Sequence, residues 1–287
     1  MNDRDLKNFA EELDFKWYEG STGYDTKFLG DNYEVPHPKL RPDIEQDIAP
    51  LKNGGKVLDY THFSIVMSKS RRLAYYTVVN IDGSQLVIIK RKKKDKWYFD
   101  PRIEREFQCG LEVYEHKDID QGHLTRRLDP VWGGEELANK ANEDTFHLTN
   151  CAPQHEGLNR KTWSDLEDYI LQNAANYKMK VTVFTGPVFR SDDVIYREIQ
   201  IPAEFWKIAV IVKEDGNLSA TAYLQSQKCL IDNLEFTYGE YKTYQVHIST
   251  IENLTGLKFG ELRKYDPKDS LESTRVHIIK SPEDVII

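Results

Sequence analysis

From His62 onwards, runs of β-branched and aromatic residues are separated by short polar stretches, a pattern that is typical of β-strands. The runs that predict strands cover residues 62–67, 73–81, 85–89, 180–185, 206–212, 218–224 and 243–248. Between the second and third runs, Asp82-Gly83 is a dipeptide favoured in tight hairpin turns. Strands outnumber helices and no regular strand–helix alternation is present. The pattern therefore predicts a single α+β domain with a mixed, mainly antiparallel central sheet.

Helical periodicity is clearest over residues 162–178. Its apolar residues gather near one face: Trp163, Leu166, Tyr169, Ile170 and Ala174. Ser164 and Glu167 have the spacing of a capping box, although the helix has room to begin earlier. A second, short amphipathic helix is expected over residues 5–14, where Leu6, Phe9, Ala10 and Leu13 share a face.

Three regions differ in their pattern along the chain. Residues 1–57 predict an irregular N-terminal arm, because prolines at 36, 38 and 42 interrupt regular structure and Gly54-Gly55 closes the segment. The strands and the long helix fall within residues 58–266, which we expect to fold as one domain. Residues 267–287 are polar and are expected to form a loose C-terminal tail.

Composition narrows the class of protein. The chain has 287 residues, a net charge of −8 and 39% hydrophobic residues, enough for a sizeable core, which excludes fibrous and fully disordered classes. No apolar run reaches the roughly 18–20 residues of a membrane helix, and the charged N-terminus lacks the apolar core of a signal peptide. Cys109, Cys151 and Cys229 are too few for a disulfide framework, so a cytoplasmic location is expected. The acidic balance argues against general coating of nucleic acid but says nothing about a local basic groove.

The densest cluster of residues able to carry chemistry lies between Asp118 and Glu167. Its pieces, in order, are Asp120-Gln121-Gly122-His123, Thr149-Asn150-Cys151-Ala152-Pro153-Gln154, Asn159 and Glu167. Taken singly, such residues are more often structural, since buried Asn and Gln usually satisfy backbone groups. Rival sites are weakly supported: the cysteines lack the C-x-x-C spacing of a zinc site, and no P-loop, dinucleotide fingerprint or nucleophile elbow is present.

The ordered set resembles the DNA/RNA non-specific endonuclease family, the ββα-metal nucleases that include mitochondrial endonuclease G and secreted bacterial nucleases. That family carries Asp-Arg-Gly-His on a strand, then Thr-Asn-x-x-Pro-Gln, then an Asn at the start of a helix and a Glu eight residues later. Further similarities run from about Leu58 to Asp266, at residues 97–101, 185–189, 201–207 and 251–257. The resemblance implies a ββα-metal active-site motif beside the sheet and makes residues 58–266 the endonuclease domain.

The resemblance also implies roles for single residues. His123 would be the general base, and Asn159 the one protein ligand of a hydrated Mg²⁺, with Mn²⁺ as the alternative. Asn150 would support the metal site or orient His123. Glu167 would lie about 12 Å along the helix from Asn159 and about 80° around it, so we expect it to hold metal-bound water rather than the metal itself.

One departure from the family concerns charge. The arginine of the Asp-Arg-Gly-His motif is Gln121 here, which removes a cation near the phosphate. Arg126 and Arg127 follow closely and could compensate, and Arg160 and Lys161 also flank the motifs; these four are the expected nucleic-acid contacts. Arg91 and Arg102 are candidates for an upstream phosphate contact. The basic stretch 90–96 is either a solvated loop or a phosphate-tracking edge, and Trp97 and Tyr98 belong more often to a core than to a base-stacking platform.

Together these features predict a Mg²⁺-dependent endonuclease that cuts DNA, and also RNA, with little sequence preference. The alternative is a catalytically weak homologue that binds nucleic acid or a protein, for which Gln121 is the main argument. A nuclease without a secretion signal endangers its own genome, so we expect restraint by an inhibitor or an activating partner. A homodimer is also considered. An effector of cellular defence, including antiviral defence, is favoured over a nuclease exported by another route.

Overall fold

The computed structural model describes residues 10–91, 95–159, 162–227, 242–270 and 277–279. Its centre is an eight-stranded sheet in the order β16-β14-β13-β12-β9-β5-β4-β3, and every neighbouring pair is antiparallel. The strands are β3 (Leu58–Asp59), β4 (Phe63–Met67), β5 (Ala74–Asp82), β9 (Lys180–Val188), β12 (Glu204–Val212), β13 (Leu218–Ser226), β14 (Lys242–Val246) and β16 (His277–Ile279). The predicted α+β class with a mainly antiparallel sheet is confirmed.

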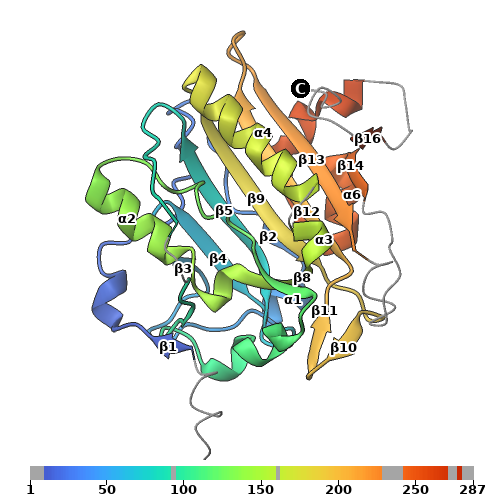
Figure 1. The fold of residues 1–287 in the computed structure, drawn as a ribbon. Helices are drawn as coiled ribbons and strands as arrows, with labels where there is room; N and C mark the ends of the chain where they lie inside the picture. The colour runs from blue at the N-terminus through green and yellow to red at the C-terminus, as the bar shows by residue number, and fades with distance from the viewer. Residues whose placement is uncertain (1–9, 92–94, 160–161, 228–241, 271–276, 280–287) are drawn as a thin grey trace, which may run out of the picture.

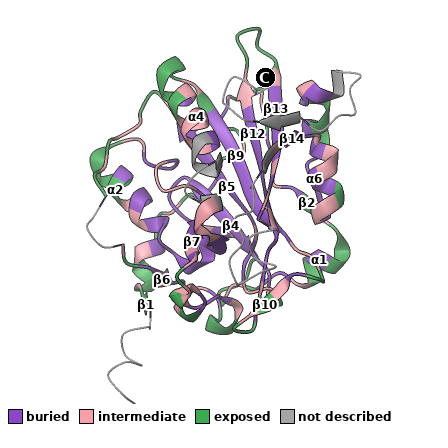
Figure 2. Cartoon of the chain, turned by 45° about the vertical axis from the view of Figure 1, so that its right-hand side comes forward, coloured by how far each residue is buried: buried purple, intermediate pink, exposed green. Residues whose placement is uncertain are grey.

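Helices cover both faces of this sheet, so its middle strands are buried along their length (Figure 1, Figure 2). On one face α4 (Thr162–Tyr177) places Leu166 and Ala174 in a cluster with Phe63 and Phe205. On the other face α6 (Ile248–Thr255) and the 3₁₀ helix η6 (Gly260–Tyr265) pack on a second cluster around Trp206. Burial on both faces explains why these strands read as continuous apolar runs.

The long helix is confirmed, but its start differs from the capping-box prediction. Helix α4 begins at Thr162, so Ser164 lies inside the helix rather than at its N-cap. The helix ends in a Schellman motif: Lys178 has a left-handed backbone (φ 53°), and the Met179 N–H donates to the Ala174 carbonyl at 2.9 Å. That end rests on Gly83, where an added Cβ would lie only 1.8 Å from the Ala174 oxygen.

The predicted strand over 85–89 and the hairpin at Asp82-Gly83 are wrong. Strand β5 ends at Asp82, and both of its sides are already paired, with β4 and β9. No edge is left beside it, so the chain turns away and makes only an isolated bridge between Leu86 and Trp132. Gly83 serves the close approach of α4 instead of a two-residue turn.

The arm and the tail are more regular than the sequence pattern predicts. Glu11–Glu12 forms strand β1, parallel to β6 (Tyr98–Phe99), so no helix covers that part of 5–14; residues 5–9 lie outside the described residues. Further along the arm are η2 (Phe15–Tyr18), β2 (Lys39–Leu40), paired with β15 (Leu257–Lys258), and α1 (Pro42–Gln46). In the expected tail, η7 (Pro267–Ser270) is helical and β16 pairs with β14.

The remaining elements lie outside the eight-stranded sheet. They are η3 (Arg105–Phe107), η4 (Leu111–Glu115), β7 (Ile119–His123), α2 (Glu135–Asp144), η5 (Leu148–Asn150), β8 (Cys151–His155), α3 (Glu156–Asn159), β10 (Val194–Tyr196) and β11 (Ile199–Ile201). Among the residues described, no helix has both the length and the apolar character that crossing a membrane requires.

Candidate active site

Two short strands and two helices bring the sequence-predicted cluster together. Strands β7 and β8 are antiparallel, with His123 opposite Cys151 and Asp120 opposite Gln154. Helix α3 follows β8 directly, and α4 follows α3, which completes a ββα unit. Gly122 leaves room for the Gln154 side chain to cross this pairing, because an added Cβ would lie 2.1 Å from the Gln154 side-chain oxygen. The motif pieces at residues 120–123 and 151–154 therefore lie side by side.

His123 lies at the end of β7 against aromatic rings. Its ring centroid is 4.7 Å from that of Trp97 and 5.1 Å from that of Phe146. The Nε2 atom is buried and has no hydrogen-bond partner. Burial, and then the positive charge of Arg91, lower the pKa of His123 to about 3. The imidazole is therefore neutral near pH 7, which is the state that can accept a proton.

Asn150 does not face the His123 ring. Its side chain is fully buried and holds the backbone just after His123: Oδ1 accepts from the Thr125 N–H at 2.8 Å, and Nδ2 donates to the carbonyls of Thr125 at 2.9 Å and Thr145 at 3.0 Å. The Asn150 carbonyl also accepts from the Leu124 N–H at 2.9 Å. With these bonds both ends of the amide are engaged, so Asn150 acts on the chain that leaves β7.

Glu167 is engaged with two cations below α4. Its carboxylate lies 3.0 Å from Nζ of Lys207, a lysine that is 1% exposed in the middle of β12, and 3.8 Å from Nε of Arg126. Lys207 also donates to Oγ1 of Thr185 at 2.9 Å and to the Leu124 carbonyl at 3.3 Å. Lys207 is not among the site residues predicted from the sequence. A signal was present, because one lysine interrupts an otherwise apolar strand run.

Arg126 and Arg127 point to different surroundings. Arg126 is paired with Asp168 and Glu167 on α4. Nearby Asp129 is buried, and this burial is the main reason why the pKa of its carboxyl is raised to about 7. Arg127 instead donates from Nη1 to Oδ1 of Asn142, on α2, at 2.8 Å. Of these two neighbours in the sequence, only Arg127 lines the pocket described next.

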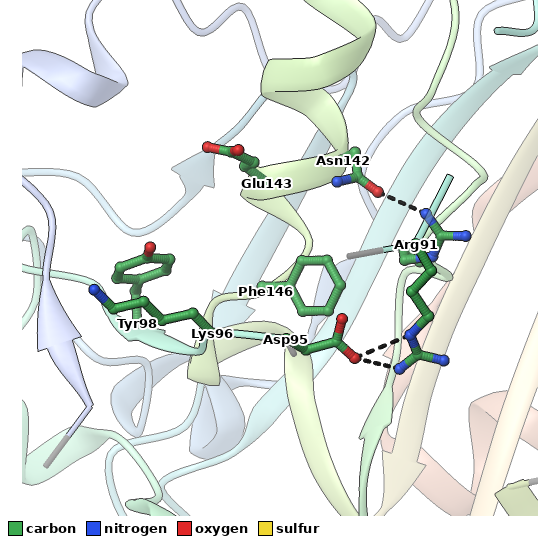
Figure 3. Close-up of a pocket in the computed structure, with 8 residues that line it drawn as sticks. Arg91, Asp95, Lys96, Tyr98, Asn142, Glu143 and Phe146 are labelled. Atoms are coloured by element: carbon green, nitrogen blue, oxygen red, sulfur yellow. Dashed lines mark hydrogen bonds and ion pairs between the residues drawn. The ribbon is translucent and has the colours of Figure 1, made fainter. Parts of the chain in front are cut away.

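This pocket, of about 50 Å³, lies between Arg91 and residues 95–98 on one side and α2 on the other (Figure 3). The residues that line it are Arg91, Asp95, Lys96, Tyr98, Arg127, Asn142, Glu143 and Phe146. Arg91 forms an ion pair with Asp95, with Nε at 3.0 Å from the carboxylate. Phe146 joins the pocket to the His123 ring. We refer to it below as the arginine pocket.

Other predicted residues have clear outcomes. Arg102 is a structural cation: it pairs with buried Asp100, donates to the Asp59 carbonyl and stacks over Tyr18. Trp97 is 8% exposed and belongs to the core, whereas Tyr98 lines the arginine pocket. Arg160, Lys161 and residues 92–94 lie outside the described residues. Asn159 ends α3, and its side chain is likewise outside the description.

The described part of the chain contains no group of three or more His, Cys, Asp or Glu side chains arranged to hold a metal ion. It does contain an amide that lacks partners at the ββα unit. Gln154 is 1% exposed, and neither its Oε1 nor its Nε2 has a hydrogen-bond partner. Buried amides are normally satisfied, so this pair of atoms has the chemistry to receive a ligand or its water.

Comparison with known proteins gives a consistent result. The family model for DNA/RNA non-specific endonuclease matches residues 41–266. An uncharacterized protein, y4fB, from Sinorhizobium fredii is 37% identical over 266 residues, covering 85% of this chain and 40% of its own length. Human mitochondrial endonuclease G is 28% identical over 158 residues, covering 51% of this chain and 50% of its own. The chain thus spans half or less of the length of these relatives.

A solved structure supports the fold. A chain from the crystal structure of the EndoG/EndoGI complex superimposes with a TM-score of 0.57 at 21% identity. The match covers 80% of this chain and 96% of that one. At this identity the similarity shows a shared fold.

Proposed function

The chain belongs to the DNA/RNA non-specific endonuclease family, and on that premise we propose that it hydrolyses phosphodiester bonds in DNA, and also in RNA, with little sequence preference. The observation that carries the proposal is His123: a neutral imidazole at the end of β7, with Nε2 lacking a partner and two arginines nearby in the arginine pocket. Such a group can take a proton from water while cations neutralise a phosphate.

In this proposal His123 accepts the proton of the attacking water at Nε2. The rings of Trp97 and Phe146 fix the orientation of the imidazole, and its low pKa keeps it unprotonated before the reaction. Asn150 holds the backbone of residues 124–125, which keeps the end of β7 in place. We therefore assign Asn150 to positioning His123, one of the two roles that the sequence left open.

The residues at the ββα unit suit a hard, hydrated cation. We propose that Asn159 holds Mg²⁺, with Mn²⁺ as the alternative, through its amide oxygen, and that Gln154 and Glu167 hold the water around it. The partnerless amide of Gln154 supports this assignment. When bound, the cation supplies charge stabilisation for the phosphate and the leaving 3′ oxygen. Lys207, at 3.0 Å, and Arg126, at 3.8 Å, fix the direction of the Glu167 carboxylate.

The activity is tested by incubating plasmid DNA with the protein and Mg²⁺, with and without a chelator. Cleavage with Mg²⁺ alone is expected, and a structured RNA should be cut under the same conditions.

Titrating Mg²⁺ tests the metal assignment: Asn159→Ala should lose metal-supported cleavage, and Glu167→Gln should need roughly 10–100-fold more metal. An equal or larger defect in Glu167→Gln would place Glu167 on the metal itself. Nucleic-acid binding without any cleavage would favour the alternative, a weak homologue that acts as a binding module, for which Gln121 is the argument.

We propose a restrained role in the cytoplasm, as an effector of cellular defence. Cys109 and Cys151 are buried free thiols, which suits a reducing compartment. An inhibitor or an activating protein would provide the restraint, and the structural neighbour was itself solved in a complex concerned with EndoG inhibition. A homodimer and the domain limits 58–266 are further proposals. The alternative to the defence role is a nuclease exported by another route. Expression of the wild type should harm a host without that restraint, and expression of His123→Ala should not.

A further inference from the structure

The imidazole of His123 lies against two aromatic rings that come from different segments of the chain. Trp97 directly precedes β6, and Phe146 follows α2; their ring centroids lie 4.7 Å and 5.1 Å from that of His123. A backbone hydrogen bond joins the two segments, from the Tyr98 N–H to the Phe146 carbonyl at 3.0 Å. Contacts that fix these two segments therefore also fix the direction in which the His123 ring points.

The N-terminal arm contacts the first of these segments through β1. Strand β1 pairs in parallel with β6, the strand that follows Trp97. Through Tyr98, β6 also bridges to His147, so β6 lies between the arm and the segment that carries Phe146. Ala10, at the start of the described arm, is buried in the same apolar cluster as both rings.

Two consecutive residues of the arm hold the second segment. Trp17 donates from Nε1 to Oδ1 of Asp144 at 2.6 Å, and the hydroxyl of Tyr18 lies 2.8 Å from Nε2 of His147. Figure 1 shows this part of the arm, in blue, beside α2. Asp144 and His147 are both fully buried, and they are the two ends of the four-residue segment that contains Phe146. The arm thus binds this segment on both sides of the ring.

The hydrogen bond between Tyr18 and His147 has a defined direction. Nδ1 of His147 lies 2.8 Å from the Asp144 carbonyl, which can only accept, so this nitrogen carries a hydrogen. Burial lowers the pKa of His147, so the ring is neutral and its Nε2 is an acceptor. The Tyr18 hydroxyl therefore donates to Nε2, and removing the hydroxyl would leave a buried acceptor without its partner.

The segment held by the arm also contacts Asn150. The Thr145 carbonyl accepts from Nδ2 of Asn150 at 3.0 Å, and the same amide binds the backbone that follows His123. The segment therefore reaches His123 by two routes, through the ring of Phe146 and through the carbonyl of Thr145.

We propose that Trp17 and Tyr18 are positioning residues for the general base: they fix residues 144–147, and this segment fixes the orientation of His123. The inference rests on the proposed nuclease function. Both residues precede the stretch 41–266 that the family model matches, so the active site of this chain depends on a part of the arm outside that stretch.

The test removes one hydrogen bond at a time and keeps an aromatic ring at each position. Trp17→Phe and Tyr18→Phe should each lower kcat for plasmid cleavage by roughly tenfold or more, because a small misplacement of a catalytic group costs up to about a hundredfold. Their affinity for a DNA duplex in chelator should equal that of the wild type, because no charge is removed.

Tyr24→Phe is the matched control. Tyr24 is a buried tyrosine of the same arm, and its hydroxyl donates to the Val35 carbonyl at 2.6 Å, but it packs in the cluster around Trp206. Its replacement should lower the Tm by a similar amount and leave kcat unchanged. A loss of kcat in Tyr24→Phe equal to that in Tyr18→Phe would overturn the proposal, because both losses would then follow from stability alone.

Amide hydrogen exchange, followed by mass spectrometry, tests the contact without any cleavage. In Trp17→Phe and Tyr18→Phe a peptide covering residues 144–150 should exchange faster by roughly fivefold or more, since the loss of a buried hydrogen bond makes local opening easier. Peptides from β9 and β12 should keep the wild-type rates. In Tyr24→Phe the rate at residues 144–150 should not change. Wild-type exchange at residues 144–150 in both arm variants would overturn the proposal.

The outcomes separate this inference from the nuclease proposal. A wild-type protein that binds DNA but never cuts it overturns the nuclease function, and the exchange rates still decide whether the arm holds residues 144–147. A wild type that cuts, together with Trp17→Phe and Tyr18→Phe variants that keep its kcat, overturns the positioning role alone.

Discussion

Single residues in the active site owe their properties to the loss of water. His123 stays neutral at pH 7 because burial, assisted by Arg91, disfavours its charged form. Lys207 has a different environment: it is 1% exposed and its Nζ lies 3.0 Å from the Glu167 carboxylate, so the two side chains form a buried ion pair.

Replacing His123 by alanine should lower the cleavage rate by roughly 10²–10⁴-fold, because a positioned general base contributes about that factor. Duplex binding in chelator should stay within a few-fold of the wild type, since the cations remain. Initial rates on plasmid DNA and binding isotherms measure the two effects. His116→Ala is the matched control, because His116 pairs with Asp118 just before β7. Wild-type cleavage by His123→Ala would show that another group acts as the base.

The position of Gln121 gives a rescue experiment. If Arg127 already supplies the missing cation, Gln121→Arg should change the wild-type cleavage rate by less than about tenfold, the lower end for one charge-assisted contact. In the Arg127→Ala background the same change should restore cleavage. Rates of the four proteins in this cycle give the coupling directly. Equal effects of Gln121→Arg in both backgrounds would mean that the two positions act independently.

At the scale of elements, α4 is held to the sheet by charge as well as by apolar packing. Leu166 and Ala174 pack on the sheet, and Glu167 reaches Lys207 on β12. On the same helix, Asp168 pairs with Arg126 from the segment that follows β7. Helix α4 is thereby joined both to β12 and to the segment that follows β7.

Breaking this contact should destabilise the fold. Glu167→Gln leaves the buried Lys207 charge with less compensation, which typically costs about 3–5 kcal/mol for a buried pair. Lys207→Met removes the charge and should cost less in combination with Glu167→Gln than the sum of the single changes. Urea unfolding of both single variants and the double variant measures this. Additive losses would mean that the two side chains do not interact in solution.

At the scale of the whole molecule, stability should depend on pH through buried histidines. Burial lowers the folded-state pKa of His123 to about 3 and lowers the pKa values of His62 and His147 below 6.5 as well. The unfolded chain therefore binds more protons than the folded protein below about pH 6.5, so the free energy of unfolding should fall as the pH is lowered. The slope is up to roughly 1.4 kcal/mol per pH unit for each such histidine.

Asp129 has the opposite sign and provides the control. Burial raises its folded-state pKa to about 7, so the folded protein holds a proton that the unfolded chain releases between about pH 4 and pH 7. Its contribution is present at low pH and is lost as the pH rises. Asp129→Asn should therefore steepen the loss of stability between pH 6.5 and pH 5. A shallower slope in Asp129→Asn would contradict the assigned direction of its pKa.

Local patterns in the sequence were enough to predict the central strands, the long helix and the order of the motif pieces. The central strands were predicted from runs of β-branched and aromatic residues, and α4 was predicted from its helical periodicity. Both kinds of element bury apolar residues at regular positions, so the pattern is visible in the sequence. The motif pieces were recognisable because their order along the chain is also their order in the ββα unit.

The partners of each segment depend on the folded chain and could not be predicted from local pattern. Residues 85–89 have the composition of a strand, but β5 is paired with β4 on one side and with β9 on the other, so it has no free edge for them. Glu11–Glu12 paired with β6 because a distant strand offered an edge, which no local pattern reveals. Arg126 and Arg127 are adjacent in the sequence, yet α4 engages the first and α2 the second. Such outcomes depend on contacts between residues far apart along the chain, and those contacts decide which cations remain available to a phosphate.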